Sequence, residues 1–140
     1  MLTSSTIEDY IRDYRPVWAF ELPKEFFPKE ILIAEEHPFF RLAYSQSSYD
    51  TRDFMSYAEM NPNRDWGERL PLAVGLSLID NEAKARKNLK LPMFRQYKGI
   101  IALTLQAADG VEKQTGAHRS HYTWWRTQSF QMSNLQMCSL

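Results

Sequence analysis

Histidine, arginine and tryptophan side chains are concentrated in residues 116–126, which read Gly-Ala-His-Arg-Ser-His-Tyr-Thr-Trp-Trp-Arg. This stretch holds two of the three histidines and two of the four tryptophans, and no Asp or Glu follows Glu112. Cations and aromatic rings without a neighbouring carboxylate suit a pocket for an anion or a planar ring. The same residues also suit a well-packed strand with a polar edge, and both interpretations stay open.

The two histidines of this stretch allow two kinds of chemistry. The spacing His118-x-x-His121 fits metal ligands on a helix. Gly116 and the aromatic run favour a loop followed by a strand instead, and zinc would lack its third and fourth ligands, so we predict no metal site. His121 is the candidate for proton transfer, because imidazole titrates near neutral pH. A purely structural, hydrogen-bonded histidine is the alternative.

The aromatic residues of the same stretch are candidate platforms for a base or a nicotinamide ring. Stacking on such rings would use Tyr122 or Trp124. On a strand, Tyr122 and Trp124 point to one face and Trp125 to the other. At least one tryptophan is therefore expected in the core. Arg119, together with Arg41 from an earlier strand, is expected to hold the phosphate of a ligand, and His118 is expected to line the same cleft.

Arg41 and Ser77 are the candidate polar residues of two earlier strands. Arg41 lies inside the apolar segment 39–44, where a charge is costly unless its head reaches water, a carboxylate or a phosphate. A sheet edge, with Arg41 on the face opposite Phe40, is the simpler explanation. Ser77 follows Gly75 in a short strand, but Ile79 stands where the Gly-x-Ser-x-Gly motif of hydrolases needs glycine.

Length and composition indicate a single domain of 140 residues that is 44% apolar and 14% aromatic. The 17 basic and 17 acidic residues cancel, so we expect no general attraction to nucleic acid. The lone Cys138 cannot form an internal disulfide, and neither a secretory signal nor an apolar run of ~20 residues is visible. These features predict a cytoplasmic protein that does not associate with membranes.

The apolar pattern predicts an α+β fold, with a mainly antiparallel sheet flanked by short helices. We expect an N-terminal helix in residues 1–15, capped by Ser5, and a core sheet region in residues 39–126. Asp109-Gly110 is a turn signal, so the segment 111–115 is expected to return beside the strand 99–105 as a hairpin. Residues 127–140 are expected to form an edge strand or a tail.

Several short segments carry a resemblance to known proteins. The order Phe40-Arg41-Leu42, Gly75-Leu76-Ser77-Leu78 and His121-Tyr122-Thr123-Trp124-Trp125 resembles small uncharacterised bacterial proteins. It is also similar to compact ADP-ribosyltransferase-like domains. That resemblance implies that Arg41 contacts the dinucleotide and that Ser77 orients the nicotinamide ribose. Where that family commonly has Glu, this chain offers His121 and Tyr122.

The leading hypothesis is therefore a domain that binds NAD or another nucleotide phosphate. The cleft would be lined by Arg41, Ser77, His118, Arg119 and His121, with Tyr122 or Trp124 beneath the ring. Ser77 and His121 would be the catalytic residues, if the protein is an enzyme. The alternative is a non-enzymatic protein-interaction module, such as an immunity protein or a toxin–antitoxin component, because no complete catalytic set is present.

Overall fold

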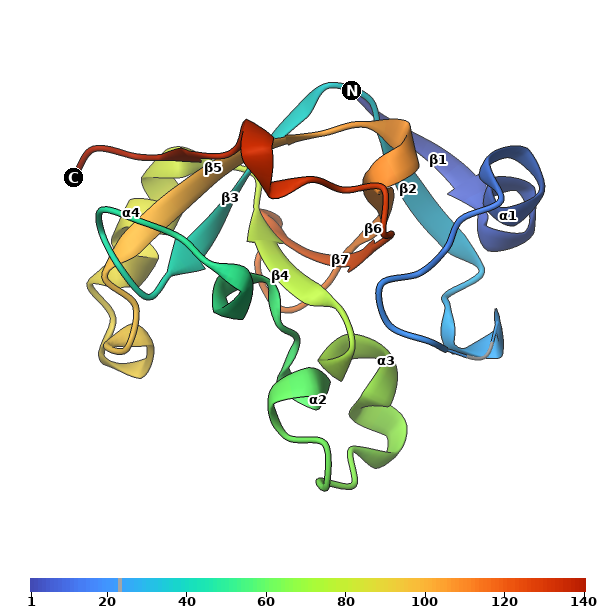
Figure 1. Cartoon of the computed structure of the whole chain (residues 1–140), viewed down its shortest axis with the longest axis horizontal. Coiled ribbons are helices and arrows are strands. Elements are labelled where there is room, and N and C mark those ends of the chain that lie inside the picture. The colour runs from blue at the N-terminus through green and yellow to red at the C-terminus, as the bar shows by residue number, and fades with distance from the viewer. Residues whose placement is uncertain (23) are drawn as a thin grey trace.

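The computed structural model describes residues 1–22 and 24–140, and in this part of the chain eight strands form one antiparallel sheet (Figure 1). The strands are β1 (Leu2–Thr6), β2 (Glu30–Ala34), β3 (His37–Ala43), β4 (Leu76–Ile79), β5 (Gly99–Leu105), β6 (Gly110–Gln114), β7 (His121–Arg126) and β8 (Gln136–Met137). The strand order is β1-β2-β6-β7-β4-β3-β5-β8, so β1 and β8 are the edges. The predicted α+β class with a mainly antiparallel sheet is confirmed.

Short helices cover parts of this sheet. They are α1 (Ile7–Tyr14), α2 (Tyr57–Met60), α3 (Leu70–Ala73) and α4 (Glu82–Leu89), with 3-10 turns η1 (Lys24–Phe26), η2 (Thr51–Phe54), η3 (Gly67–Arg69), η4 (Pro92–Phe94), η5 (Ala107–Asp109) and η6 (Met132–Asn134). Helices α2 and α3 project below the sheet (Figure 1). Within the described residues, no helix is long and apolar enough to cross a bilayer.

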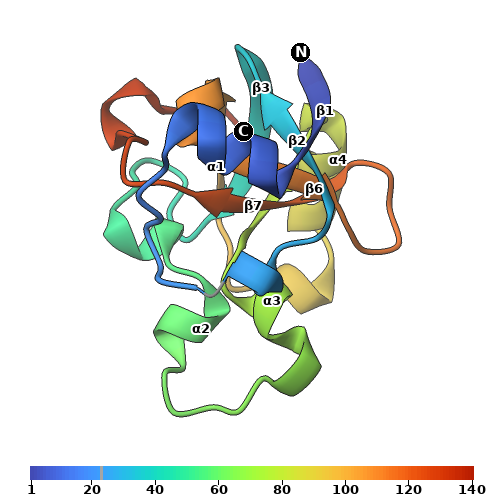
Figure 2. The ribbon, with the colours of Figure 1, turned by 90° about the vertical axis from the view of Figure 1, so that its right-hand side faces the viewer.

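The sheet curls around an inner core, and helices pack on its outer face. Phe39, Leu78, Leu103 and Trp124 belong to one cluster of buried side chains that joins both halves of the sheet. Helix α1 follows directly from the edge strand β1 (Figure 2), and its Ile7 and Tyr10 belong to a buried cluster on the outer face that also holds Trp125 of β7. Helix α4 packs through Ala85 against β4 and β5. The burial of apolar surface on both faces is the main force that holds the strands in this arrangement.

The N-terminal helix begins later than predicted, and its cap is a different residue. The hydroxyl of Thr6, not Ser5, accepts the N–H of Asp9 at 3.1 Å, and the helix starts at Ile7. The preceding residues form β1, which pairs with β2 from Leu2 to Thr6. A strand that leads directly into a helix leaves Ser5 inside the ladder, opposite Ile31. The expected helix in residues 1–15 is therefore shorter.

The predicted hairpin between residues 99–105 and 111–115 is wrong. Strand β5 pairs with β3 and β8, whereas β6 pairs with β2 and β7. The turn η5 separates the two strands and is closed by a capping box between Gln106 and Asp109. In it, the backbone N–H of Gln106 donates to the Asp109 carboxylate at 2.8 Å. Gly110 then begins β6 with φ of 136°, which carries the chain into the other half of the sheet.

Other predicted elements match the structure more closely. Strands β3, β5 and β7 lie where alternation and apolar runs placed them, and the C-terminal segment contributes the edge strand β8. The sequence also predicts a helix from Thr51 to Met60, but the structure divides this segment into η2 and α2, with Asp50 and Ser56 as separate caps. For the helix that the sequence predicts after Asp80, the cap is Asn81 instead.

Candidate functional site

The register of the strands assigns each predicted site residue to a face of the sheet. Ser77 pairs with Thr123, and Ile79 pairs with His121. Residues directly opposite each other in an antiparallel pair share a face, so Ser77 and His121 both belong to the outer face. Tyr122 and Trp124 alternate with them and face inward. Phe40 lies opposite Ile79 and so shares the outer face with it. The side chain of the next residue, Arg41, therefore leaves β3 on the inner face.

Trp124 cannot serve as a ring platform, which corrects its predicted role. Its side chain is fully buried in the inner core. There its ring packs edge-on against that of Phe130, with the ring centroids 4.8 Å apart. The indole N–H donates to the carbonyl oxygen of Asp109 at 3.1 Å. The hydrophobic gain from burying an indole and its satisfied N–H hold it there.

Tyr122 is half-buried on the same inner face, away from His121. Its ring packs edge-on against Phe39 at 5.4 Å. Burial raises the pKa of Tyr122, and the carboxylate of Asp80 raises it further. The hydroxyl therefore stays protonated at neutral pH, and the ring forms part of the inner wall instead of a ligand platform.

A first hollow, here called the His hollow, lies between α4, η4 and the loop of residues 116–120. Its volume is about 210 Å³, and it is lined by His118 and His121, by Lys84 and Asn88 of α4, and by the apolar Met93 and Phe94. Lys84 and Asn88 are four residues apart on α4, so both project to one side of the helix. The hollow therefore joins cations on one wall with apolar side chains on another.

Hydrogen bonds fix the imidazole of His121. Its Nδ1 lies 3.0 Å from the carbonyl oxygen of Thr115 and 3.1 Å from the Thr115 hydroxyl. That hydroxyl also bonds to the hydroxyl of Thr123 at 2.7 Å. A carbonyl oxygen can only accept, so we assign the proton of the neutral ring to Nδ1. Nε2 then carries a lone pair, which can accept a proton or a hydrogen bond from a ligand.

The elements around the His hollow are basic. Residues 83–108 contain six Lys or Arg and no Asp or Glu, and residues 113–140 contain three and none. The nearest preceding acid, Glu82, is paired with Arg86 at 2.9 Å. Asp80 interacts with Tyr122 on the inner face. The chain has no net charge, but Lys84 lines this hollow, and among the described residues no carboxylate does so.

Arg119 belongs to the same loop but does not line the His hollow. Its side chain is exposed, as is that of His118. Its carbonyl oxygen accepts a hydrogen bond from the side-chain amide of Gln114 at 2.9 Å, which ties the loop to the end of β6. The guanidinium is therefore free to approach a ligand from the rim.

A second hollow, here called the Arg41 cavity, contains the other two predicted residues. Nε of Arg41 donates to the carbonyl oxygen of Asp53 at 2.6 Å, and Nη1 donates to that of Ser77 at 2.8 Å. Strands β3 and β4 share only the pair Phe40–Ile79, so the guanidinium bridges the point where they separate. The structure brings Arg41 and Ser77 together, but in a hollow different from that of His121.

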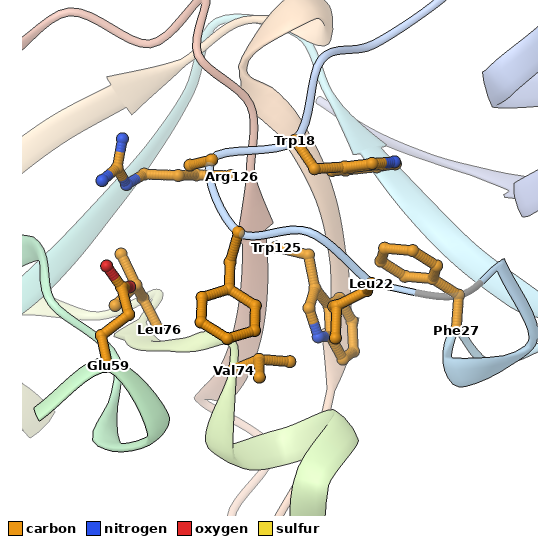
Figure 3. Close-up of a pocket in the computed structure, with 10 residues that line it drawn as sticks. Trp18, Leu22, Phe27, Glu59, Val74, Leu76, Trp125 and Arg126 are labelled. Carbon is orange, nitrogen blue, oxygen red and sulfur yellow. The ribbon is translucent and has the colours of Figure 1, made fainter. Parts of the chain in front are cut away.

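A third group of side chains, rich in tryptophan, is core (Figure 3). Trp18, Phe27 and Trp125 surround a space of about 10 Å³, which is room for at most one water. The indole N–H of Trp125 donates to the carbonyl oxygen of Pro71 at 2.8 Å. Arg126 lies at one end, and burial lowers its pKa while the charge of Glu59 opposes that shift.

Sequence reasoning missed most of the residues that line the two hollows. The pattern around Lys84 and Asn88 predicts only a helix, and the sequence indicates no site role for Tyr44, Tyr57 and Tyr97. The carboxylate-free run of residues 83–108 was a visible signal for the basic wall. No local signal links the three tyrosines, because they come from separate elements and meet only in the folded chain.

No protein-family model matches the chain, and its sequence and fold find no match among curated proteins or solved structures. Within the described residues, no three His, Cys, Asp or Glu side chains are grouped as metal ligands would be. The geometry of the two hollows is therefore the basis for inferring a function.

Proposed function

We propose that the protein binds a small phosphate-bearing molecule of the nucleotide type in the His hollow. One observation carries this proposal: Lys84, His118 and His121 converge on a hollow whose surrounding segments carry no free carboxylate. The ammonium of Lys84 attracts an anion, and a phosphate offers several acceptors to it. An imidazole that takes up a proton at Nε2 becomes a further donor to the same phosphate. The apolar side chains of Met93 and Phe94 suit the ring of the same ligand.

The size of the hollow limits the ligand. Pockets for drug-sized molecules usually enclose about 300–1,000 Å³. The His hollow, at about 210 Å³, matches one phosphate and one ring. NAD, the cofactor expected from the ADP-ribosyltransferase-like resemblance, would enter with one half only. A single dinucleotide would have to span both hollows to meet Arg41 and His121 together.

Proton transfer is the chemistry that His121 would supply if the protein is an enzyme. Its Nδ1 is held by Thr115, so Nε2 is the atom available to a ligand hydroxyl or leaving group. Ser77 is a weaker candidate for nucleophile, because Thr123, not His121, lies opposite it in the register. Among the described residues, no hydrogen bond joins the Ser77 hydroxyl to an imidazole that could activate it.

Calorimetric titration with AMP and with adenosine tests the proposal, because the two ligands differ only by the phosphate. We expect AMP to bind and adenosine to bind at least about tenfold more weakly. Lys84→Met should weaken AMP binding by a similar factor, whereas Lys87→Met, on the exposed side of α4, should not. Equal affinities for AMP and adenosine, or no heat from either, would refute the proposal.

A protein-interaction module remains the second candidate, and the region of α2 and α3 supports it. Tyr57 and Leu72 are 48% and 51% exposed there, although both are large apolar residues. A shallow groove of about 470 Å³ beside them is lined in part by Trp66. The guanidinium of Arg64 lies over the Trp66 ring, with its Cζ 4.2 Å from the ring centroid. Leu72→Lys should leave the free energy of unfolding within about 0.5 kcal/mol and should abolish any complex detected by sedimentation.

A further inference from the structure

The Arg41 cavity combines a cation with several hydroxyl donors. It encloses about 30 Å³ and is lined by the guanidinium of Arg41, by Ser77 and by three phenol rings, those of Tyr44, Tyr57 and Tyr97. Ser77 is exposed, so the cavity opens to solvent. Its lining residues come from β3, β4 and α2, among other segments.

The charge of Arg41 has no partner of opposite sign in contact with it. Among the residues that the structure describes, the ion pairs involve only Arg12 and Arg86. The nearest acid, Asp53, uses its two carboxylate oxygens for the backbone N–H groups of Tyr44 and Asp50, each at 3.0 Å. Burial lowers the pKa of Arg41, but a guanidinium remains charged in a protein. A half-buried charge of this kind is costly unless an anion compensates it.

Donors remain free for such an anion. A guanidinium has five N–H groups, and the bonds to Asp53 and Ser77 use two of them. Burial, with the neighbouring Tyr57 and Tyr44, raises the pKa of Tyr97, so its hydroxyl keeps its proton at neutral pH. The hydroxyl of Tyr44 donates to Sδ of Met60 at 3.8 Å, which leaves the N–H groups of Arg41 and the hydroxyls of Tyr57 and Tyr97 as donors. Among the described residues, no carboxylate lines this space.

The size and shape of the cavity select among anions. A single water requires roughly 10–15 Å³, so 30 Å³ admits about two or three polar atoms. A planar carboxylate has two oxygens that match the guanidinium fork, whereas a tetrahedral phosphate has four. The remainder of the molecule would extend past Ser77 into solvent.

We propose that the Arg41 cavity binds the carboxylate group of a small organic acid. This site is separate from the His hollow and does not depend on nucleotide binding there. The protein would then recognise two ligands, or one ligand with two acidic groups, at two hollows that both border β4.

Titration with formate, followed by the NMR signal of the Arg41 Nε–H group, tests this proposal. The ionic strength is held constant with chloride. We expect a saturable shift with formate and with acetate, and a weaker response to phosphate. Tyr97→Phe and Tyr57→Phe each remove one hydroxyl without opening the core, and each should weaken formate binding about tenfold. Tyr14→Phe, an exposed phenol on α1, is the matched control and should bind formate like the unaltered chain.

Several outcomes would overturn the proposal. One is an Arg41 signal that responds to formate no more than to chloride. Another is an equal affinity for formate in all three tyrosine variants. Tighter binding of phosphate than of formate would replace the carboxylate by a phosphate ligand. Signals of His121 report separately on the His hollow, so failure at one site is distinguishable from failure at the other.

Discussion

The imidazole Nδ1 of His121 lies 3.0 Å from the carbonyl oxygen of Thr115. This contact fixes the orientation of the ring and selects the neutral tautomer that carries its proton on Nδ1. The same carbonyl is part of the backbone and cannot be removed by a side-chain substitution. The tautomer should therefore survive changes in the neighbouring side chains.

We predict that His121 is protonated on Nδ1 at alkaline pH, both in the unaltered chain and in Thr115→Val. Long-range proton–nitrogen correlation spectra measure this directly. Thr115→Val also removes the hydroxyl partner of the buried Thr123, which should lower the free energy of unfolding by about 1–2 kcal/mol. The exposed His118 provides the reference for an unconstrained ring. A dominant Nε2–H form of His121 would contradict the assignment.

Arg41 is expected to stabilise the fold even without a ligand. It satisfies the carbonyl oxygens of Asp53 and Ser77 where β3 and β4 separate. Lysine is a point charge without the planar fork, so Arg41→Lys should leave one carbonyl without its partner. We expect a loss of about 1–3 kcal/mol in urea unfolding. Arg12→Lys, which affects only exposed ion pairs, should change stability by less than about 0.5 kcal/mol. Equal losses in the two variants would mean that Arg41 bridges nothing essential.

Local signals in the sequence located most strands, but not their partners. The apolar run of β5 and the alternation in β3 and β7 are properties of single segments, so they could be read directly. The hairpin from β5 to β6 was wrong because the turn signal at Asp109-Gly110 marks a change of direction without specifying the neighbour. Which strand β6 meets is decided by packing across the whole sheet.

The candidate site was predictable in its residue types and not in its grouping. Alternation along each strand already predicts that His121 and Tyr122 point to opposite faces of the sheet, as do Arg41 and Phe40. Alternation could not predict how β3 and β4 pair. They share the single pair Phe40–Ile79, beyond which the two strands separate. Arg41 reaches the carbonyl oxygen of Ser77 there, whereas His121 lies opposite Ile79 and lines the His hollow. This difference explains why residues predicted to share one cleft line two hollows.

Two glycines with positive φ should differ greatly in their tolerance of alanine. At Gly110, φ is 136° and an added Cβ would meet the carbonyl oxygen of Trp125. At Gly67, φ is 53° and nothing lies within 4 Å. Gly110→Ala should cost on the order of 3 kcal/mol, since backbone strain and overlap combine. Gly67→Ala should cost about 1 kcal/mol, the penalty of the left-handed conformation alone. Thermal unfolding measures both. Similar losses would show that β6 can shift away from β7.

The carboxyl group of Glu112 makes the stability of the protein depend on pH. The side chain is fully buried in β6, and neither carboxyl oxygen has a hydrogen-bond partner among the described residues. Burial raises the pKa of Glu112 well above 4.5, and the charge of Asp109 raises it further. The nearby backbone of Ala34 acts in the opposite direction and lowers the pKa of Glu112 in part. The folded chain therefore holds a proton that the unfolded chain releases.

The sign of the effect follows from this difference in proton binding. Below the ordinary pKa of a glutamate, Glu112 is protonated in both the folded and the unfolded state. There it does not contribute to the pH dependence of the free energy of unfolding. As the pH rises above about 4.5, the unfolded state ionises first, so the free energy of unfolding falls until the folded pKa is reached.

Glu112→Met should flatten this decline and stabilise the fold at neutral pH by on the order of 1–3 kcal/mol, because it removes an unpartnered buried polar group. Urea unfolding across the pH range measures both effects. The exposed Glu35, changed to Met, should keep the decline. If Glu112→Met instead destabilises the protein at neutral pH, the carboxyl group must have a partner in solution.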